Sequence, residues 1–383
     1  MPGVYVRGMG LSCALGNDVE SSVAALSGSV AAPAEVRLEQ GAERVCVPFY
    51  RMPDHAELTD PARFARILSQ VVCAAVAQAG LTYVEVSRLP VFVGSSCFSI
   101  GLSELEFETE LNYAPEQAIP MPMCGYQDIA NMARHAVGCD GETFTYNTAC
   151  TSSANALLGA ARMLQLGWYR HALVIGAELF NRTTLCGFAG LQLVADKLRP
   201  FDAGRNGIVL GEGVGAILLS SQPDGAAGLR LVGGASNCDT SSVTTANPDG
   251  GTVAAVLHTA LRNAGMEPAA IQGIKAHGTA TPSGDTAEAR GLQKVFPKLP
   301  PVTVLKPYLG HTLGACGVIE LILFGSALRR RFLPATPGFE IVDPDLGVHP
   351  LTRPEPARAG TYLLNYFGFG GNNTVLVLEH GAS

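Results

Sequence analysis

Short apolar runs alternate with helical patterns along the chain, and this alternation predicts an α/β fold. In the first half, apolar runs predict strands at residues 4–9, 90–96, 142–147 and 171–177. Helical patterns lie between them, at about residues 18–25, 62–79 and 127–135, with an acidic amphipathic segment at 101–111. The first strand is expected to end at Gly10. Residues 28–60 and 114–124 are expected to be irregular, and the apolar runs 208–211 and 214–219 predict a hairpin around Glu212-Gly213.

The second half of the chain repeats this plan. Strands are predicted at residues 228–234, 271–276, 302–305, 362–366 and 374–378, and helices at 252–264 and 313–330. The last two strands flank Gly368-Phe369-Gly370-Gly371 and predict a second hairpin. Each half is expected to place a helix rich in small residues centrally and to close with a glycine-rich hairpin. We therefore predict duplicated α/β halves, residues 1–225 and 226–383.

A sharp turn between the strand at 142–147 and a helix rich in small residues carries Cys150. A thiol at a helix start meets unsatisfied backbone N–H groups and the positive end of the helix dipole. These favour the thiolate by about 0.3–1 kcal/mol, and by up to ~2 kcal/mol when the thiol is partly buried. The turn therefore predicts an activated nucleophile. A small buried cysteine that only packs is the alternative if Cys150 has no catalytic partners.

Two histidines of the second half follow predicted strands. His277 opens a loop of glycine, threonine and serine, and His311 precedes an apolar helix whose face cannot accommodate an imidazole. Together with Cys150, they occupy equivalent points of the two halves and predict one catalytic constellation. Lys306, five residues before His311, has a purely structural alternative, an ion pair with Glu320 or another carboxylate.

Composition excludes several functional classes. The 383 residues are 47% hydrophobic and only 15% charged, with 44 glycines, which indicates a tightly packed globular chain. The net charge of −7 and the lack of long basic runs argue against a nucleic-acid partner. Ten scattered cysteines without a CxxC pair argue against a zinc site or a disulfide framework. No secretory leader or run of ~20 apolar residues is present, so we expect a cytoplasmic protein without a membrane partner.

Five motifs follow one another in a fixed order across most of the chain. They are Thr-Ala-Cys-Thr-Ser-Ser-Ala at 148–154, Pro-Phe-Asp at 200–202 with Gly-Glu-Gly at 211–213, His-Gly-Thr-Ala-Thr-Pro at 277–282, Lys-x4-His with Gly-Ala-Cys-Gly at 306–317, and Gly-Phe-Gly-Gly at 368–371. With these motifs the chain resembles a β-ketoacyl-acyl-carrier-protein synthase of the elongating, Cys-His-His type. The resemblance implies the thiolase-like fold, with duplicated halves in an αβαβα layer arrangement.

The same resemblance implies a decarboxylative Claisen condensation. Cys150 would take an acyl group from an acyl carrier protein as a thioester. His277 and His311 would polarise the malonyl thioester carbonyl and assist decarboxylation, giving an enolate that attacks the acyl-cysteine. The backbone N–H groups of Cys150 and Phe369 match the family's oxyanion hole.

Further residues are matched by the resemblance to supporting roles. Lys306 would support the histidines electrostatically, Phe369 would gate the two substrates, and Thr279 and Thr281 would hold the pantetheine arm. No resident cofactor is implied, because the carrier protein brings the phosphopantetheine. The expected partners are the acyl carrier protein and a second copy of the chain in a homodimer, or a related synthase chain in a heterodimer.

Two other readings remain open beside the condensing enzyme. A chain-length-factor-like partner of a heterodimeric synthase would lack the nucleophile, so the presence of Cys150, His277 and His311 argues against it. A thiolase-type acyl-coenzyme A transferase or a hydrolase would use a second cysteine in a C-terminal glycine-rich loop. The chain departs from the family pattern at Tyr146, Asn147, Asn206, Pro307 and Tyr308. These departures leave the acyl chain open, and the pathway remains open among fatty-acid, polyketide and polyene synthesis. The sequence as a whole is similar to aryl-polyene synthases.

Overall fold

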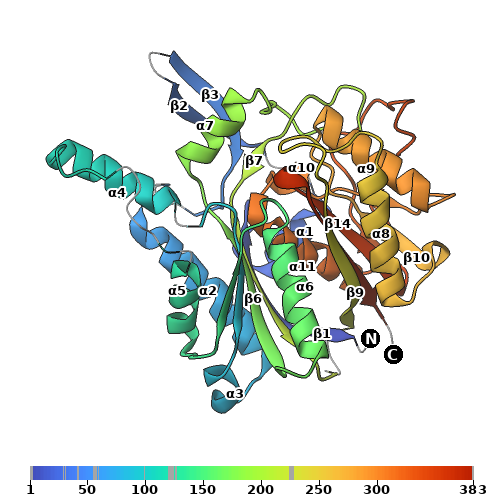
Figure 1. The fold of residues 1–383 in the computed structure, drawn as a ribbon, viewed down its shortest axis with the longest axis horizontal. Coiled ribbons are helices and arrows are strands. Elements are labelled where there is room, and N and C mark those ends of the chain that lie inside the picture. Colours follow the sequence, from blue (N-terminus) through green and yellow to red (C-terminus); the bar gives the residue numbers. More distant parts are fainter. Residues whose placement is uncertain are drawn as a thin grey trace.

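The computed structural model describes residues 3–381, except residues 29, 31, 41–42, 55–57, 59, 99, 120–124, 126 and 224–227. The main strands of the first half are β1 (Val4–Cys13), β4 (Val91–Gly94), β5 (Thr143–Tyr146), β6 (His171–Glu178) and β8 (Gly213–Ser220). Those of the second half are β9 (Leu229–Cys238), β10 (Ile271–Lys275), β11 (Val302–Thr303), β14 (Gly360–Phe367) and β15 (Asn372–His380). Within the described residues, these ten strands form one sheet in the order β11-β10-β14-β15-β9-β1-β8-β6-β4-β5 (Figure 1).

The two halves of this sheet have the same topology. In the first half, β4 pairs in parallel with β5 and β6, while β8 runs antiparallel to β6 and β1. In the second half, β10 pairs in parallel with β11 and β14, while β15 runs antiparallel to β14 and β9. The strands β1 and β9 pair in the middle and join the halves. The predicted duplication is therefore confirmed, whereas the predicted boundary between residues 225 and 226 lies outside the described residues.

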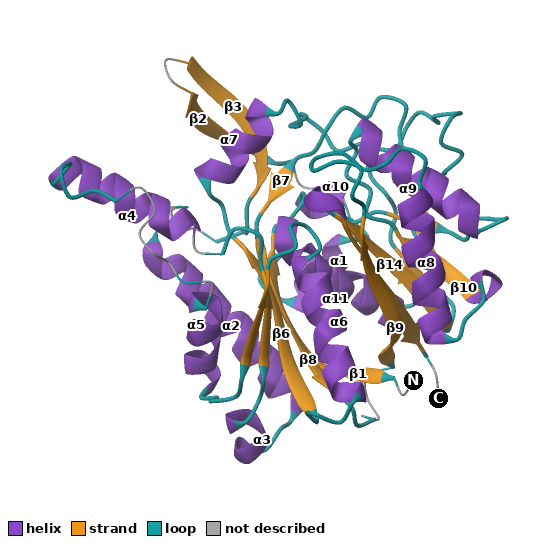
Figure 2. Ribbon diagram, viewed as in Figure 1, coloured by secondary structure: helices purple, strands orange, loops and turns teal. Residues whose placement is uncertain are grey.

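Helices cover the sheet in layers (Figure 2). The helices α6 (Ser152–Gln165) and α11 (Cys316–Arg329) pack against each other between the two halves of the sheet. One outer face is covered by α2 (Pro61–Ala79) and α5 (Asp128–Val137), and the other by α8 (Gly251–Ala264) and α9 (Pro282–Val295). This is the αβαβα arrangement of the thiolase-like fold, as predicted.

The central pair of helices is close because small residues face each other. A Cβ atom on Gly317 would lie 2.2 Å from the backbone nitrogen of Ala154, so glycine is required where α11 meets the first turn of α6. Apart from Glu320, the helix α11 is mostly apolar all round, and it is buried from Cys316 to Leu328 because strands and helices surround it. The first turns of both central helices are thereby held in contact.

Smaller elements surround this core. The remaining helices are α1 (Val19–Ala25), α3 (Tyr83–Ser87), α4 (Ile100–Tyr113), α7 (Arg182–Gly190) and α10 (Lys306–Leu309), with single turns η1 (Pro268–Ala270), η2 (Leu313–Ala315) and η3 (Phe369–Gly371). The remaining strands are β2 (Ala34–Gln40), β3 (Glu43–Tyr50), β7 (Leu210–Gly211), β12 (Phe332–Leu333) and β13 (Glu355–Pro356). None of the helices in the described part of the chain is long and apolar enough to cross a membrane.

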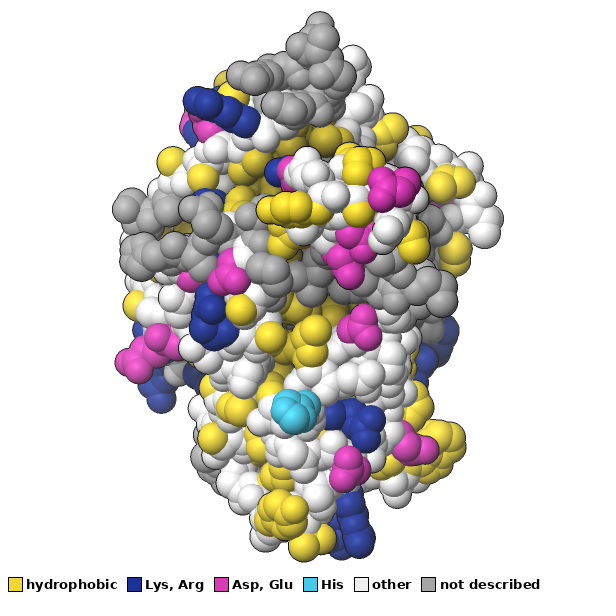
Figure 3. Space-filling view, turned by 90° about the vertical axis from the view of Figure 1, so that its left-hand side faces the viewer, with side chains coloured by type: hydrophobic (Ala, Val, Ile, Leu, Met, Phe, Trp, Pro, Cys, Tyr) yellow, Lys and Arg dark blue, Asp and Glu magenta, His cyan; other side chains and the backbone are white. Residues whose placement is uncertain are grey.

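The helix α4 projects from the body of the molecule (Figure 1). This helix and the residues after it expose Leu111, Tyr113 and Ile119. The face drawn in Figure 3 carries hydrophobic side chains scattered among acidic and basic ones. Of the segment 114–124, which we predicted to be irregular, residues 114–119 contain no helix or strand, and residues 120–124 lie outside the described residues.

Two predictions for the first half are wrong, the first of them in part, because the chain makes long-range pairings. Within residues 28–60, β2 and β3 form an antiparallel ribbon in which Val36 and Leu38 alternate with charged residues, whereas the described residues of 51–60 contain no helix or strand, as predicted. The runs at 208–219 do not form a hairpin, because β7 pairs with β3 while β8 enters the main sheet. Glu212 lies between them, fully buried and 2.6 Å from the guanidinium of Arg63. The first half therefore does not close with a glycine-rich hairpin.

The first strand also continues through Gly10 instead of ending there. A Cβ atom at Gly10 would lie 2.0 Å from the carbonyl oxygen of Val71 in α2, so this glycine allows the helix to pack closely on β1. The C-terminal hairpin is confirmed, since β14 and β15 pair along their whole length around Gly368-Phe369-Gly370-Gly371.

Candidate active site

Cys150 lies in a strained turn between β5 and α6. The preceding Ala149 has a φ of 50°, a left-handed conformation that is costly for any residue with a Cβ. Side chains hold the turn: the Ser152 hydroxyl accepts from the Thr148 N–H at 3.0 Å and donates to the Ala149 carbonyl at 2.6 Å. The Thr151 hydroxyl donates to the Thr148 carbonyl at 2.7 Å. The local sequence thus fixes the thiol at the start of α6.

The glycine-rich loop of the C-terminal hairpin lies against this turn. A Cβ atom at Gly368 would come within 3.0 Å of the Cys150 backbone nitrogen, so the two backbones are adjacent. The next residue, Phe369, stacks its ring on Phe188 of α7, with ring centroids 5.4 Å apart. The Gly370 N–H donates to the Val243 carbonyl at 2.7 Å and holds the loop in place. The backbone of Phe369 therefore lies beside the thiol.

His277 extends from the end of β10 into the same site. Its backbone N–H and that of Gly278 donate to the two carboxylate oxygens of Glu288, each at 2.9 Å. Its ring lies 5.3 Å from the ring of His311 and nearly perpendicular to it. Lys306 donates from Nζ to the Nδ1 of His277 at 3.2 Å. Since Nδ1 accepts this hydrogen bond, the ring proton of neutral His277 lies on Nε2.

His311 contacts the thiol itself. Its Nε2 lies 3.1 Å from the Cys150 Sγ. The backbone N–H of His311 donates to the Val209 carbonyl at 2.8 Å, and its carbonyl accepts from the Gly211 N–H at 3.1 Å. These bonds hold the backbone of His311 against residues 209–211, so the imidazole and the sulfur come from different halves of the fold.

Lys306 lies behind the histidines and takes part in the ion pair that we considered as its alternative. Its Nζ donates to Glu320 Oε1 at 2.8 Å, and both side chains are buried. The same Nζ contacts His277, so the ion pair and the contact with a histidine coexist. Lys306 therefore reaches the site through His277 and does not line the pocket.

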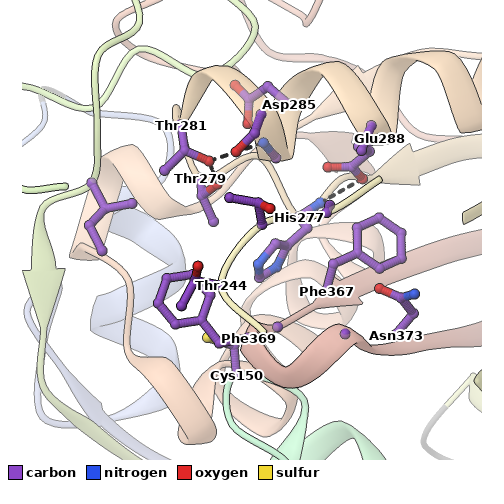
Figure 4. Close-up of a pocket in the computed structure, with 18 of the residues that line it drawn as sticks. Cys150, Thr244, His277, Thr279, Thr281, Asp285, Glu288, Phe367, Phe369 and Asn373 are labelled. Atoms are coloured by element: carbon purple, nitrogen blue, oxygen red, sulfur yellow. Dashed lines mark hydrogen bonds between the residues drawn. The ribbon is translucent and has the colours of Figure 1, made fainter. Parts of the chain in front are cut away.

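The thiol and the two histidines line one pocket, part of which is drawn in Figure 4, and the exposed Val243 lines it as well. It is lined by the predicted residues Cys150, His277, Thr279, Thr281, His311 and Phe369. The hydroxyls of Thr279 and Thr281 lie 3.0 Å apart, and the Thr281 hydroxyl also accepts from the Gly284 N–H to cap α9. The structure thus brings every predicted pocket residue together, with two hydroxyls along the approach to the thiol.

Burial reverses the predicted effect of the helix start on Cys150. Burial raises the pKa of Cys150 from its ordinary value of 9.0 to about 11, while the positive charge of Lys306 and the backbone N–H of Phe369 lower the pKa by less. The resting group is therefore a thiol at neutral pH, not the thiolate that we predicted. Its proton has to be removed by a neighbouring base.

Both imidazoles are suited to accept or donate protons because they are neutral. Burial, and then the charge of Lys306, hold the pKa of His277 and of His311 well below 6.5. His311 can accept the Cys150 proton at Nε2 over the 3.1 Å contact. The arrangement is a thiol, a neutral base and a second neutral imidazole in one buried pocket.

Sequence reasoning missed residues that hold these groups in place, two of which line the pocket themselves. Glu288 of α9 accepts both N–H groups before the glycine-rich loop, and Asp239 accepts from Ser241 and Asn247 in a loop whose next residues line the pocket. Lys275 is the last residue of β10, two residues before His277, and its side chain is fully buried. The signal available in the sequence was a lysine two residues before His277 in an otherwise apolar strand end.

Two protein-family models match the chain. The model described as the N-terminal domain of β-ketoacyl synthase matches residues 1–225, and that of the C-terminal domain matches residues 229–340. Among curated proteins, the 3-oxoacyl-[acyl-carrier-protein] synthase 2 of Mycobacterium leprae is 30% identical over 78% of this chain and 75% of its own length. The protein of the same name from Synechocystis is 31% identical over 83% of this chain and 82% of its own length.

Solved structures agree with these matches. The ketosynthase ApeO of Xenorhabdus doucetiae, in complex with its chain length factor ApeC, has a TM-score of 0.85 at 27% identity, over 99% of this chain and 98% of that one. The ishigamide ketosynthase/chain length factor has a TM-score of 0.86 at 26% identity over the whole of both chains. A β-ketoacyl synthase from Burkholderia phymatum has a TM-score of 0.85 at 26% identity, again over both whole chains.

Proposed function

The chain belongs to the β-ketoacyl synthase family, and on this premise we propose that it catalyses the decarboxylative condensation of an acyl thioester with malonyl-acyl carrier protein. The product is a 3-oxoacyl-acyl carrier protein. The observation that carries the proposal is the 3.1 Å contact between Cys150 Sγ and the neutral His311, with His277 beside it in the same pocket.

In the first half-reaction, Cys150 accepts the acyl group. Nε2 of His311 takes the thiol proton as Sγ attacks the thioester carbonyl, and the bond from the acyl carbon to the pantetheine sulfur breaks. The proton then returns from His311 to the departing pantetheine thiolate. The backbone N–H groups of Cys150 and Phe369 are our candidates to stabilise the oxyanion, because both lie beside the sulfur.

In the second half-reaction, the two imidazoles act on the malonyl thioester. The Nε2–H of neutral His277 donates to the thioester carbonyl, and His311 donates as well after exchanging to the tautomer that carries its proton on Nε2. The bond to the carboxylate carbon breaks with release of carbon dioxide. The electron pair moves into an enolate, which attacks the acyl carbon on Cys150 and expels the Cys150 thiolate. The Cys150 thiolate then takes up one proton from solvent and becomes the resting thiol again, so the steps balance and the proposal includes no resident cofactor.

The pocket suits a carrier-bound substrate. Thr279 and Thr281 place two hydroxyls along the approach to the thiol, where they can hydrogen-bond the amides of a pantetheine arm. Phe369 stacks on Phe188 at the same pocket and is our candidate for the gate between the two substrates. An acyl carrier protein is therefore the proposed partner, in accordance with the names of the curated relatives.

A dimer is part of the proposal. The strand β5 ends the sheet and pairs only with β4 among the described residues, and α4 exposes apolar side chains nearby in the chain. The partner is a second copy or a related synthase-like chain, since similar ketosynthases form complexes with a chain length factor. The described cysteines are all free, which fits the reducing cytoplasm that we propose as its location.

Mass spectrometry of the chain incubated with acyl-loaded carrier proteins of different lengths tests this function. We expect an acyl adduct on Cys150 and carbon dioxide release once malonyl-acyl carrier protein is added. Acylation that requires a related synthase chain would identify a heterodimer. A chain that is never acylated, alone or with such a partner, would instead be a chain-length-factor-like subunit, and acylation from acyl-coenzyme A without carbon dioxide release would indicate a thiolase-type transferase.

A further inference from the structure

A second buried lysine lies beneath the active site, and the steps proposed above do not use it. Lys275 is the last residue of β10, and its side chain is fully buried. Its Nζ forms an ion pair with Glu320 Oε2 and donates to the Asn365 carbonyl at 2.7 Å. The ring of Tyr366 lies 3.7 Å from the same ammonium group.

Lys275 is connected to the catalytic groups through Glu320. One carboxylate oxygen of Glu320 accepts from Lys275 and the other from Lys306, and Lys306 then contacts His277. Lys275 ends β10, and His277 follows it two residues later. Lys275, Glu320, Lys306 and His277 thus form a continuous chain of contacts, which we call the lysine relay.

With both lysines protonated and Glu320 ionised, the lysine relay carries one positive charge in excess; burial lowers the pKa of Lys275, and the charge of Glu320 opposes this effect. Lys306 and Glu320 alone would be a neutral pair, and Glu320 would cancel much of the field of Lys306 at Cys150. With Lys275 on its other oxygen, Glu320 is compensated, and the charge of Lys306 acts on the thiol. Satisfying Glu320 Oε2 requires only a neutral donor such as an amide, which is less costly to bury than an ammonium group. The excess charge therefore calls for a functional explanation.

Titratable groups lie around the lysine relay on the helices and strands that pack against it. They are Lys275 and His277 at and just after the end of β10, Lys306 on α10, His311 before η2, Cys316 and Glu320 on α11, Tyr366 on β14, Glu288 on α9, Glu178 on β6, and Cys150 before α6. Burial raises the pKa of the Tyr366 phenol well above 10 and keeps it neutral, and burial likewise keeps the Cys316 thiol neutral. Charge at the relay is therefore set by the two lysines and Glu320.

We propose that Lys275 is a positioning residue whose charge, acting through Glu320 and Lys306, favours the anionic form of Cys150. The same field favours the enolate of the second half-reaction and disfavours protonation of the two imidazoles, which Lys275 also opposes directly. The inference deepens the proposed function and rests on it for the enolate, but its effect on the free thiol can be measured without any substrate.

Alkylation of Cys150 by iodoacetamide, followed by mass spectrometry between pH 7 and 9, tests the proposal. The alkylation rate is proportional to the fraction of Cys150 that is ionised. A variant whose plot of log rate against pH is shifted from that of the wild type therefore reports the change in the pKa of Cys150, even though that pKa lies above the pH range measured. Lys275→Met should slow alkylation by about tenfold, on the order of one pKa unit. Lys275→Arg should stay within about threefold of the wild type, and Lys298→Met, at an exposed lysine, should have no effect.

Removing the negative charge of Glu320 tests whether a more positive lysine relay speeds the alkylation of Cys150. Glu320→Gln should speed alkylation, and Lys275→Met combined with Glu320→Gln, which restores one net positive charge, should return to within about threefold of the wild type. If Lys275→Met does not fold, Lys275→Gln keeps a donor to Glu320 and carries the same prediction. Three results would overturn the proposal: slower alkylation in Glu320→Gln, a double variant that is slower than either single variant, or equal rates in all variants. A wild-type chain that follows these rates yet never condenses would contradict the proposed function alone.

Discussion

Replacing His311 and replacing His277 should affect the two half-reactions differently, because only the ring of His311 contacts the sulfur of Cys150. His311 lies 3.1 Å from the Cys150 Sγ, whereas His277 contacts Lys306. The variants His311→Ala and His277→Ala remove one imidazole each from the same pocket. From sequence we expected both histidines to act on the malonyl group; the contact with the sulfur gives His311 a second part in acylation.

The expected loss of acylation rate follows from the protonation state of the Cys150 thiol. With a pKa of about 11, roughly one Cys150 in ten thousand is ionised at pH 7, so acylation depends on a base. Loss of a positioned base typically costs on the order of 10²–10⁴ in rate. His311→Ala should therefore slow acylation by at least about 100-fold. His277→Ala should leave acylation within about threefold of the wild type, but should slow carbon dioxide release by about 10²–10³-fold through loss of a donor to the enolate.

The assay is rapid quenching, with mass spectrometry for the acyl adduct on Cys150 and a separate measurement of carbon dioxide release. His258→Ala, an exposed residue of α8, serves as the matched control and should change neither rate. Acylation at the wild-type rate in His311→Ala would show that the 3.1 Å contact does not activate the thiol. Equal loss of acylation in both variants would mean that the histidines act as one structural unit, and the division of roles would be wrong.

Three further predictions follow from the nucleophile, the helix packing and the sheet edge. Cys150→Ala should abolish the covalent acyl adduct and keep a cooperative thermal transition, since alanine fits the turn; an adduct on this variant, seen by mass spectrometry, would exclude Cys150 as the acceptor. Gly317→Ala should lower the free energy of unfolding by about 1–3 kcal/mol in denaturant titrations, because the added methyl would lie 2.2 Å from the Ala154 nitrogen; unchanged stability would contradict this packing. Light scattering should give twice the chain mass of 39.9 kDa, whereas a fully active monomer would refute the dimer.

The sequence was informative where the chemistry depends on neighbouring residues. The small residues around Cys150 predicted its turn, and His277 was placed correctly because it directly follows an apolar strand. The duplicated order of strands could also be predicted, since each half repeats the same alternation. These features depend on local spacing, which a single sequence displays.

Long-range contacts explain what the sequence did not reveal. The pKa of Cys150 depends on burial between α6, α11 and the hairpin loop, and no local pattern indicates that this burial outweighs the helix start. Glu320 and Lys275 are 45 residues apart, so their pairing is visible only once the layers are assembled. Glu212 interrupts two apolar runs like a turn residue, yet it is buried against Arg63, and this is why the predicted hairpin was wrong.

The central claim is that the chain joins two carrier-bound groups through Cys150 with loss of carbon dioxide. The most direct measurement is the mass of the carrier protein after incubation of the chain with an acyl-acyl carrier protein and malonyl-acyl carrier protein labelled with carbon-13 at C2. Our account predicts a 3-oxoacyl group two carbons longer than the donor, containing one labelled carbon, together with release of the unlabelled carboxyl carbon as carbon dioxide. A carrier protein that keeps only its original acyl and malonyl groups, although Cys150 is acylated, would contradict the account.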